Sequence, residues 1–177
     1  AMTGANGSQR PDFAAIAQCI SRDAHVLDLG CGDGTLLKYL QQSRGVTGYG
    51  VEIDDGNVLA CVNNGVNVIQ GDLERGLAEF ADGSFDFVVL SQTLQAMRNT
   101  ERIVREMLRV GRAGIVTFPN FGHWKNRLQI LRGRMPVSNR LPFEWFDTPN
   151  IHLCTVADFE RFCGERGIRI VSRTVLS

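Results

Sequence analysis

The sequence lacks an excess of charge of either sign, because 19 Lys and Arg residues balance 19 Asp and Glu residues over 177 positions. A neutral chain has no overall field that attracts nucleic acid or an anionic membrane. It also lacks an apolar run near the ~20 residues that span a bilayer, and its first residues have no signal-peptide pattern. We therefore expect a cytoplasmic protein whose partners are small molecules or other proteins.

Cysteine pairs with a recognisable function are missing too. The five cysteines form no CxxC pair, and no His/Cys cluster has the spacing of a zinc site. We expect reduced, mostly buried thiols and no metal. The length fits one domain. Ala1 precedes Met2 in a stretch rich in Gly, Asn and Ser, so we expect a cloning scar and disorder over residues 1–10 and a single domain over 11–177.

Short apolar runs alternate with segments whose apolar residues recur at helical spacing, which is typical of a parallel sheet covered by helices. The pattern predicts an α/β protein with a doubly wound, mostly parallel sheet. The first five strands are expected at residues 25–30, 46–52, 66–70, 85–91 and 114–118. The helices between and before them are expected near 13–20, 35–42, 55–63 and 100–109.

After residue 154 the chain returns to regular patterns. Thr155 and Asp158 form a TxxD helix start, followed by Phe159 and Phe162 on the expected helix. The string "IRIVSRTV" at 168–175 predicts a sixth strand.

The glycine-rich string "DLGCGDGT", Asp28 to Thr35, follows the first strand. Glycines there let a ligand approach the backbone, and the amides that open the next helix favour a negative group. A dinucleotide fingerprint needs GxGxxG, but its third position is Thr35 and Gly34 comes one residue early. The spacing therefore disfavours a nicotinamide cofactor.

The remaining pattern, Asp28-x-Gly30-x-Gly32-x-Gly34, resembles the cofactor loop of class I S-adenosylmethionine-dependent methyltransferases, and the resemblance runs from residue 24 to about 118. It implies S-adenosylmethionine or S-adenosylhomocysteine as cofactor. Carboxylates near the loop attract the ligand's ammonium and sulfonium and would repel a pyrophosphate. The positions implied to bind cofactor are Asp28, Gly30, Cys31, Gly32, Glu52, Ile53, Asp72, Leu73, Ser91 and Gln92.

Two of these positions have a specific expected role. Glu52 ends the second strand, where a carboxylate accepts bonds from ribose hydroxyls, and the resemblance places Asp72 against the adenine amino group. Each acid has an alternative: Asp72 caps a turn, Glu52 pairs with a surface cation, and Asp28 braces the loop. The sequence departs from the resembled pattern at Gln95, where a histidine is common, and at "VGRAG" before the fifth strand.

Longer strings, above all "FPNFGHW" and "DTPNIHLC", are similar to the methionine biosynthesis protein MetW family over nearly the whole chain. This resemblance implies a methyltransferase-like fold and an association with a MetX-type homoserine O-acyltransferase in methionine synthesis. Compared with that fold, the sequence has a long insertion between the fifth and sixth strands. The usual seventh strand, which lies between those two, is not visible: it is either lost from this chain or pairs differently.

The insertion, residues 119–154, holds four of the five prolines, both tryptophans and two of the three histidines. Its length is typical of a lid or a docking segment. Trp124, Leu128 and Leu131 fall on one face of a predicted short helix, which either packs over the sheet or contacts a partner.

Candidate residues for substrate or partner in this segment are Asn120, His123 and Trp124. Asn120, His123, Asp147 and His152 are also candidates for catalysis. No catalytic residue is assigned, because methyl transfer needs a base only when the nucleophile must lose a proton. A histidine beside a tryptophan is more often a packing residue.

Three functions remain. The first is a MetW-like, S-adenosylmethionine-binding protein that acts with the acyltransferase, with or without methyl transfer. The second is an ordinary small-molecule methyltransferase with residues 119–154 as its lid. The third, a module that has lost its cofactor, is disfavoured because the glycines and acids of the cofactor edge are retained.

Overall fold

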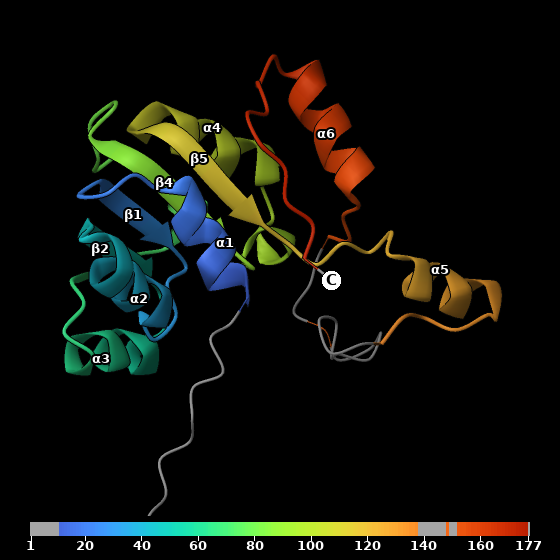
Figure 1. Ribbon diagram of the computed structural model, residues 1–177, viewed down its shortest axis with the longest axis horizontal. Helices are drawn as coiled ribbons and strands as arrows, with labels where there is room; N and C mark the ends of the chain where they lie inside the picture. The colour runs from blue at the N-terminus through green and yellow to red at the C-terminus, as the bar shows by residue number, and fades with distance from the viewer. Residues whose placement is uncertain (1–10, 138–147, 149–151, 177) are drawn as a thin grey trace, which may run out of the picture.

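Within residues 11–137, 148 and 152–176, which the computed structural model describes, five parallel strands form one sheet in the order β3-β2-β1-β4-β5 (Figure 1). The strands are β1 (His25–Leu29), β2 (Thr47–Glu52), β3 (Val68–Gln70), β4 (Phe85–Ser91) and β5 (Gly111–Thr117). The predicted doubly wound α/β sheet is confirmed. The disorder predicted for residues 1–10 concerns positions outside the described residues.

Helices cover both faces of the sheet. The described helices are α1 (Pro11–Cys19), α2 (Thr35–Arg44), α3 (Asp55–Asn63), α4 (Thr100–Val110), α5 (Trp124–Leu131) and α6 (Val156–Glu165), with single turns η1 (Leu73–Arg75) and η2 (Leu94–Ala96). Of these, α5 lies beyond the end of β5 and does not cover the sheet (Figure 1). Successive residues of a strand point to opposite faces. Val26 thus packs with α1, α2 and α3, whereas its neighbour Leu27 packs with α4, and α6 adds partly buried phenylalanines to that second cluster.

Polar caps set the starts of the later helices. The Asp54 side chain accepts a hydrogen bond from Asn57 N at the start of α3. The Thr155 hydroxyl accepts one from Asp158 N at 3.1 Å at the start of α6, as its TxxD signal predicts. Phe159 of α6 then packs against Phe118, with ring centroids 5.2 Å apart, so the cap and the apolar face together place α6 beside the end of β5.

The predicted sixth strand is wrong for the described residues, because 168–176 contain no strand. Ile168 packs against the core, but Val171 is 84% exposed. A strand needs a hydrogen-bonded neighbour, and in the resembled fold the seventh strand lies between the fifth and the sixth. The described chain has no strand in that place, so β5 is the edge of the described sheet.

Candidate functional site

The candidate site lies at the carboxyl ends of β1, β2 and β4, where the strand order reverses and α/β sheets open a crevice for ligands. The loop from Gly30 to Gly34 leaves β1 there and leads into α2. Gly30 N and Cys31 N both donate to Val51 O, at 2.8 and 3.1 Å, which ties the loop to β2. Gly30 has φ +67°, and a Cβ on it would lie 2.8 Å from the Thr93 hydroxyl oxygen. The loop therefore needs glycine at this position for its own backbone path.

Glu52, the last residue of β2, holds this loop with its carboxylate. Its Oε2 accepts from Gly32 N at 2.9 Å, and its Oε1 accepts from Ile53 N and Asp54 N at 2.8 and 3.0 Å. The side chain is buried and makes no ion pair within the described part of the chain, so pairing with a surface cation is wrong. A carboxylate offers about four acceptor positions, so roughly one remains for a ligand hydroxyl.

Asp28, beside the loop on β1, is only 2% exposed. Among the described residues no group donates a hydrogen bond to its carboxylate, so it does not brace the loop. Burial, with a smaller contribution from the charge of Glu52, raises the pKa of Asp28 to about 7. A cation placed beside it would favour the ionised form.

Cys31 contributes its backbone to the loop and its side chain to the core. Its Sγ lies 3.7 Å from Cys61 Sγ, and the Cys61 thiol donates to Gly32 O at 3.1 Å. Burial is the main cause that raises the pKa of both thiols, so they stay protonated and unreactive. The close approach of Cys31 to Gly50 explains why β2 carries a glycine there.

The residues after β2 and β3 differ in their environment. Ile53 is 61% exposed beside Glu52, although it is a large apolar side chain. Asp72 caps η1, accepting from Glu74 N at 2.9 Å, so the capping alternative is confirmed for this residue. Leu73 packs against the core cluster on the α4 side of the sheet.

Ser91 and Gln92 are held at the end of β4 by Thr117, the last residue of β5. The hydroxyls of Ser91 and Thr117 lie 3.1 Å apart, and Gln92 N donates to the Thr117 hydroxyl at 3.1 Å. Gln92 has φ +56°, a backbone conformation that residues other than glycine rarely adopt. Sequence reasoning missed Thr117, and its place at the end of the fifth predicted strand was the available signal.

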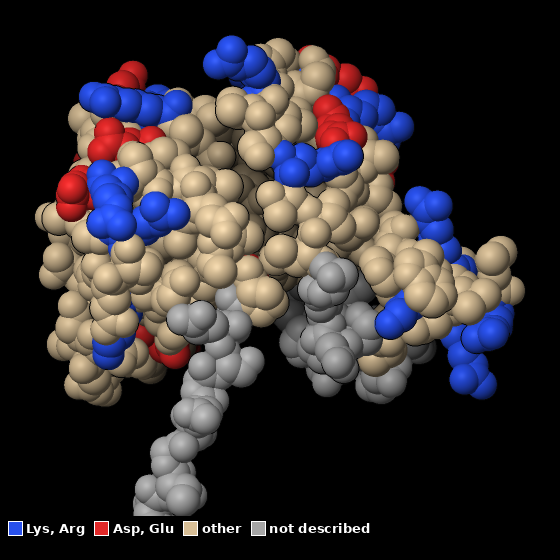
Figure 2. All heavy atoms as spheres, viewed as in Figure 1, with Lys and Arg blue, Asp and Glu red and all other residues tan. Residues whose placement is uncertain are grey.

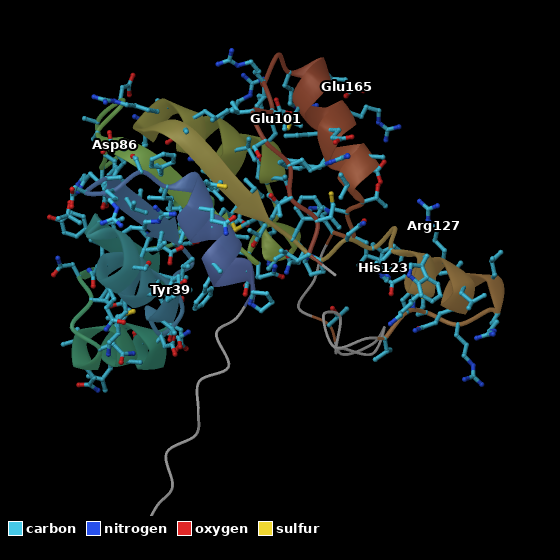
Figure 3. All side chains as sticks on the ribbon, viewed as in Figure 1. Tyr39, Asp86, Glu101, His123, Arg127 and Glu165 are labelled. Carbon is cyan, nitrogen blue, oxygen red and sulfur yellow. The ribbon has the colours of Figure 1, made fainter. Side chains whose placement is uncertain are left out.

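Asn120 and His123 lie in the segment between β5 and α5, and Trp124 is the first residue of α5. Figure 3 shows the labelled His123 at the start of α5. The Asn120 side chain accepts from Gly122 N at 3.0 Å, and His123 Nδ1 accepts from Lys125 N at 3.4 Å as the cap of α5. Trp124 is 63% exposed. Asn120 and His123 thus shape the backbone that presents Trp124.

Of the two other candidate catalytic residues, His152 and Asp147, the structure describes only His152. His152 is exposed and its N donates to Gln95 O at 3.0 Å, whereas Asp147 lies outside the described residues. Of the residues described, none form a group of three or more His, Cys, Asp or Glu suited to a metal ion. In the same part of the chain, no helix has the length and apolar character needed to cross a bilayer.

Solved structures of the same architecture define the class of fold. A SAM-dependent methyltransferase from Archaeoglobus fulgidus superposes with a TM-score of 0.67 at 17% identity, over 89% of this chain and 68% of that one. Another from Thermotoga maritima gives 0.65 at 19% identity, over 88% and 69%. The protein has the Rossmann-like fold of class I methyltransferases.

Sequence comparison narrows the class to a family. The family described as "Methionine biosynthesis protein MetW" matches residues 10–177. The bifunctional methionine biosynthesis protein MetXA/MetW of Rhodopirellula baltica is 38% identical over 169 residues, 90% of this chain and 27% of that protein. Norajmaline N-methyltransferase of Rauvolfia serpentina is 24% identical over 78% of this chain and 50% of that enzyme. The chain belongs to the MetW family, and it spans about a quarter and half of the length of these two relatives.

Proposed function

We propose that this MetW family protein binds S-adenosylmethionine, or its product S-adenosylhomocysteine, at the carboxyl edge of the sheet. The observation that carries the proposal is the bond from Gly32 N to the Glu52 carboxylate. In a dinucleotide site a phosphate takes the loop amides, but here an acid of the chain occupies one of them and buried Asp28 lies close by. The Glu52 carboxylate, together with Asp28 when Asp28 is ionised, repels a phosphate and favours a cationic ligand.

The residues around the loop fit the rest of such a ligand. The remaining acceptor position of Glu52 suits a ribose hydroxyl, and exposed Ile53 offers an apolar surface to a flat base. The carboxylate of Asp28, which accepts no hydrogen bond from the described residues, suits the ammonium end, either directly or through water. The bound sulfonium would supply an activated methyl group, while these residues bind and orient it.

Calorimetric titration tests the proposed site. We expect S-adenosylmethionine and S-adenosylhomocysteine to bind with one-to-one stoichiometry, and NAD or ATP not to bind, because their phosphates meet the two carboxylates. Binding of NAD with equal affinity would contradict the assignment.

We infer further that the protein acts in methionine biosynthesis together with a homoserine O-acyltransferase of the MetX type. Support comes from the Rhodopirellula protein, in which a MetXA part and a MetW part share one polypeptide. Since S-adenosylmethionine is made from methionine, its binding next to an early enzyme would report the level of the end product. Titration of the acyltransferase with and without S-adenosylmethionine tests this coupling; identical affinities would contradict the sensing role.

A second candidate function is methyl transfer to a small molecule. Gln95 favours it, because its Oε1 is buried and accepts no hydrogen bond within the described residues. Gln95 lines a small pocket with Phe118 and Phe121, and its oxygen can accept a hydrogen bond from an N–H or O–H group. Incubation with methyl-labelled cofactor and cell extract tests it: labelled product and S-adenosylhomocysteine support transfer, and persistent absence of both supports a binding role.

A further inference from the structure

Helix α5 exposes apolar side chains and buries a polar one toward the protein body. Trp124, Leu128 and Leu131 are 63%, 38% and 83% exposed, whereas polar Asn126 is only 4% exposed. Residues at i, i+4 and i+7 share one helix face, so the three apolar side chains form one stripe, named the α5 stripe. It faces away from the side chain that anchors the helix. A helix that only packed against the sheet would turn this stripe inward.

Polar bonds, and not apolar burial, hold the helix in this orientation. Asn126 Nδ2 donates to Phe121 O at 3.2 Å and to Asn120 O at 3.4 Å. At the other end, Val137 N donates to Gln129 Oε1 at 2.9 Å, and Gln129 Nε2 donates to Val137 O at 3.2 Å. Figure 1 shows α5 projecting beyond the end of β5, to the side of the body. The bonds therefore fix a helix whose apolar stripe is presented outward.

Positive charge flanks the α5 stripe on both sides. At 3.6 residues per turn, Arg127 and Arg132 lie roughly 40° around the axis from opposite edges of the stripe. Residues 119–137 carry four cations and no Asp or Glu. Figure 2 shows cations around the protruding segment, and Figure 3 shows the labelled Arg127 side chain pointing away from the body. An apolar stripe between cations matches an apolar groove with an acidic rim.

The same charges argue against a second copy of this chain as the partner that binds the α5 stripe. A two-fold contact would set each stripe and its arginines against the identical arginines of the partner, with only repulsion at the rim. A membrane surface is less suited as well, because the described helix has eight residues and offers little apolar area for insertion.

We propose that the α5 stripe docks into an apolar groove with an acidic rim on the MetX-type acyltransferase. This rests on the partnership stated under Proposed function and adds the surface that makes it. Tryptophan and arginine are among the residue types that dominate binding in protein interfaces. The stripe contains Trp124, and Arg127 and Arg132 flank it. The relative that joins MetXA and MetW parts in one chain is consistent with a contact between them.

Binding of the purified acyltransferase to variants of the full chain tests the proposal. We expect Trp124→Ala to weaken binding at least about tenfold, as for an interface hot spot. Arg127→Glu with Arg132→Glu should weaken binding and reduce its salt dependence. Leu59→Ala on α3, where Leu59 is 62% exposed, and Arg22→Glu are the matched controls and should bind as wild type. Unchanged thermal unfolding of each variant confirms that the fold is intact.

The outcomes separate the surface from the partnership. If wild type does not bind the acyltransferase, the partnership fails and the docking proposal falls with it. If wild type binds and the α5 variants bind equally well, the partnership stands and the α5 assignment is overturned.

Oxidative footprinting adds a second measurement. Trp124 should be labelled strongly in the free protein and protected in the complex. Protection of Trp124 in the free protein, by residues 138–151 or by a second copy, would overturn the proposal. So would binding to anionic phosphatidylserine vesicles that depends on Trp124, if the acyltransferase does not protect Trp124.

Discussion

Asp28→Asn removes a carboxyl whose pKa is raised by burial and by Glu52 from 3.8 to about 7. A shift of about three pKa units corresponds to about 4 kcal/mol, at 1.36 kcal/mol per unit. Between pH 4 and 7 the folded protein keeps this proton while the unfolded chain has lost it. The stability that Asp28 contributes is therefore greatest below pH 4 and decreases as the pH rises to 7.

The variant should show the difference directly. In urea unfolding from pH 5 to 8, the free energy of unfolding of wild type should fall relative to Asp28→Asn, by up to about 1.4 kcal/mol per pH unit below pH 7. Above pH 8 the difference should become constant. A difference that does not change with pH would refute the raised pKa of Asp28.

The affinity for the cofactor should also follow the titration of Asp28, but it should rise with pH, whereas the stability falls. A cationic ligand favours ionised Asp28, and the ionised fraction rises about tenfold from pH 6 to pH 8 when the pKa is about 7. We expect S-adenosylmethionine binding to release a proton near pH 6.5, measured by calorimetry in two buffers with different ionisation enthalpies. Asp28→Asn should lose this release, and equal release from both proteins would contradict the role of Asp28.

Two further substitutions test the packing around the site. Gly50→Ala places a Cβ against Cys31 Sγ, so we expect the free energy of unfolding to fall by about 1–3 kcal/mol. The second substitution Cys31→Ala should restore part of this loss. No loss in the single variant would contradict the close packing. Thr155→Ala removes the cap that accepts from Asp158 N, and urea unfolding should show a loss of about 1 kcal/mol. An unchanged midpoint would show that α6 does not need its cap.

Elements with local signals could be predicted from the sequence. The strand periodicity located β4 at Phe85–Ser91, and the TxxD signal located the start of α6 at Val156. The predicted strand at 168–175 failed because a strand depends on a distant neighbour, and a propensity cannot show whether that neighbour is present. The direction of α5 was hidden for a similar reason: the sequence showed the apolar stripe, but not that Asn126 would anchor the other side.

For the candidate site, the sequence could predict where the residues lie but not which hydrogen bonds they make. Parallel strands bring their carboxyl ends to one edge, so the sequence predicted that Asp28, Glu52 and Ser91 lie at the same edge. Whether their oxygens are already engaged depends on backbone geometry. Glu52 accepts from three backbone amides, whereas Asp28 accepts from no described group. Spacing alone does not distinguish these two environments.

The affinity of S-adenosylmethionine for wild type and for Glu52→Ala, measured by calorimetry at pH 7.5, tests the proposed cofactor site most directly. The substitution removes a hydroxyl acceptor and the carboxylate that holds Gly32 N. One lost charge-assisted bond of at least about 1.5 kcal/mol corresponds to about tenfold weaker binding. We predict one-to-one binding by wild type and at least about tenfold weaker binding by a folded Glu52→Ala variant. Equal affinity of the two proteins would contradict the site.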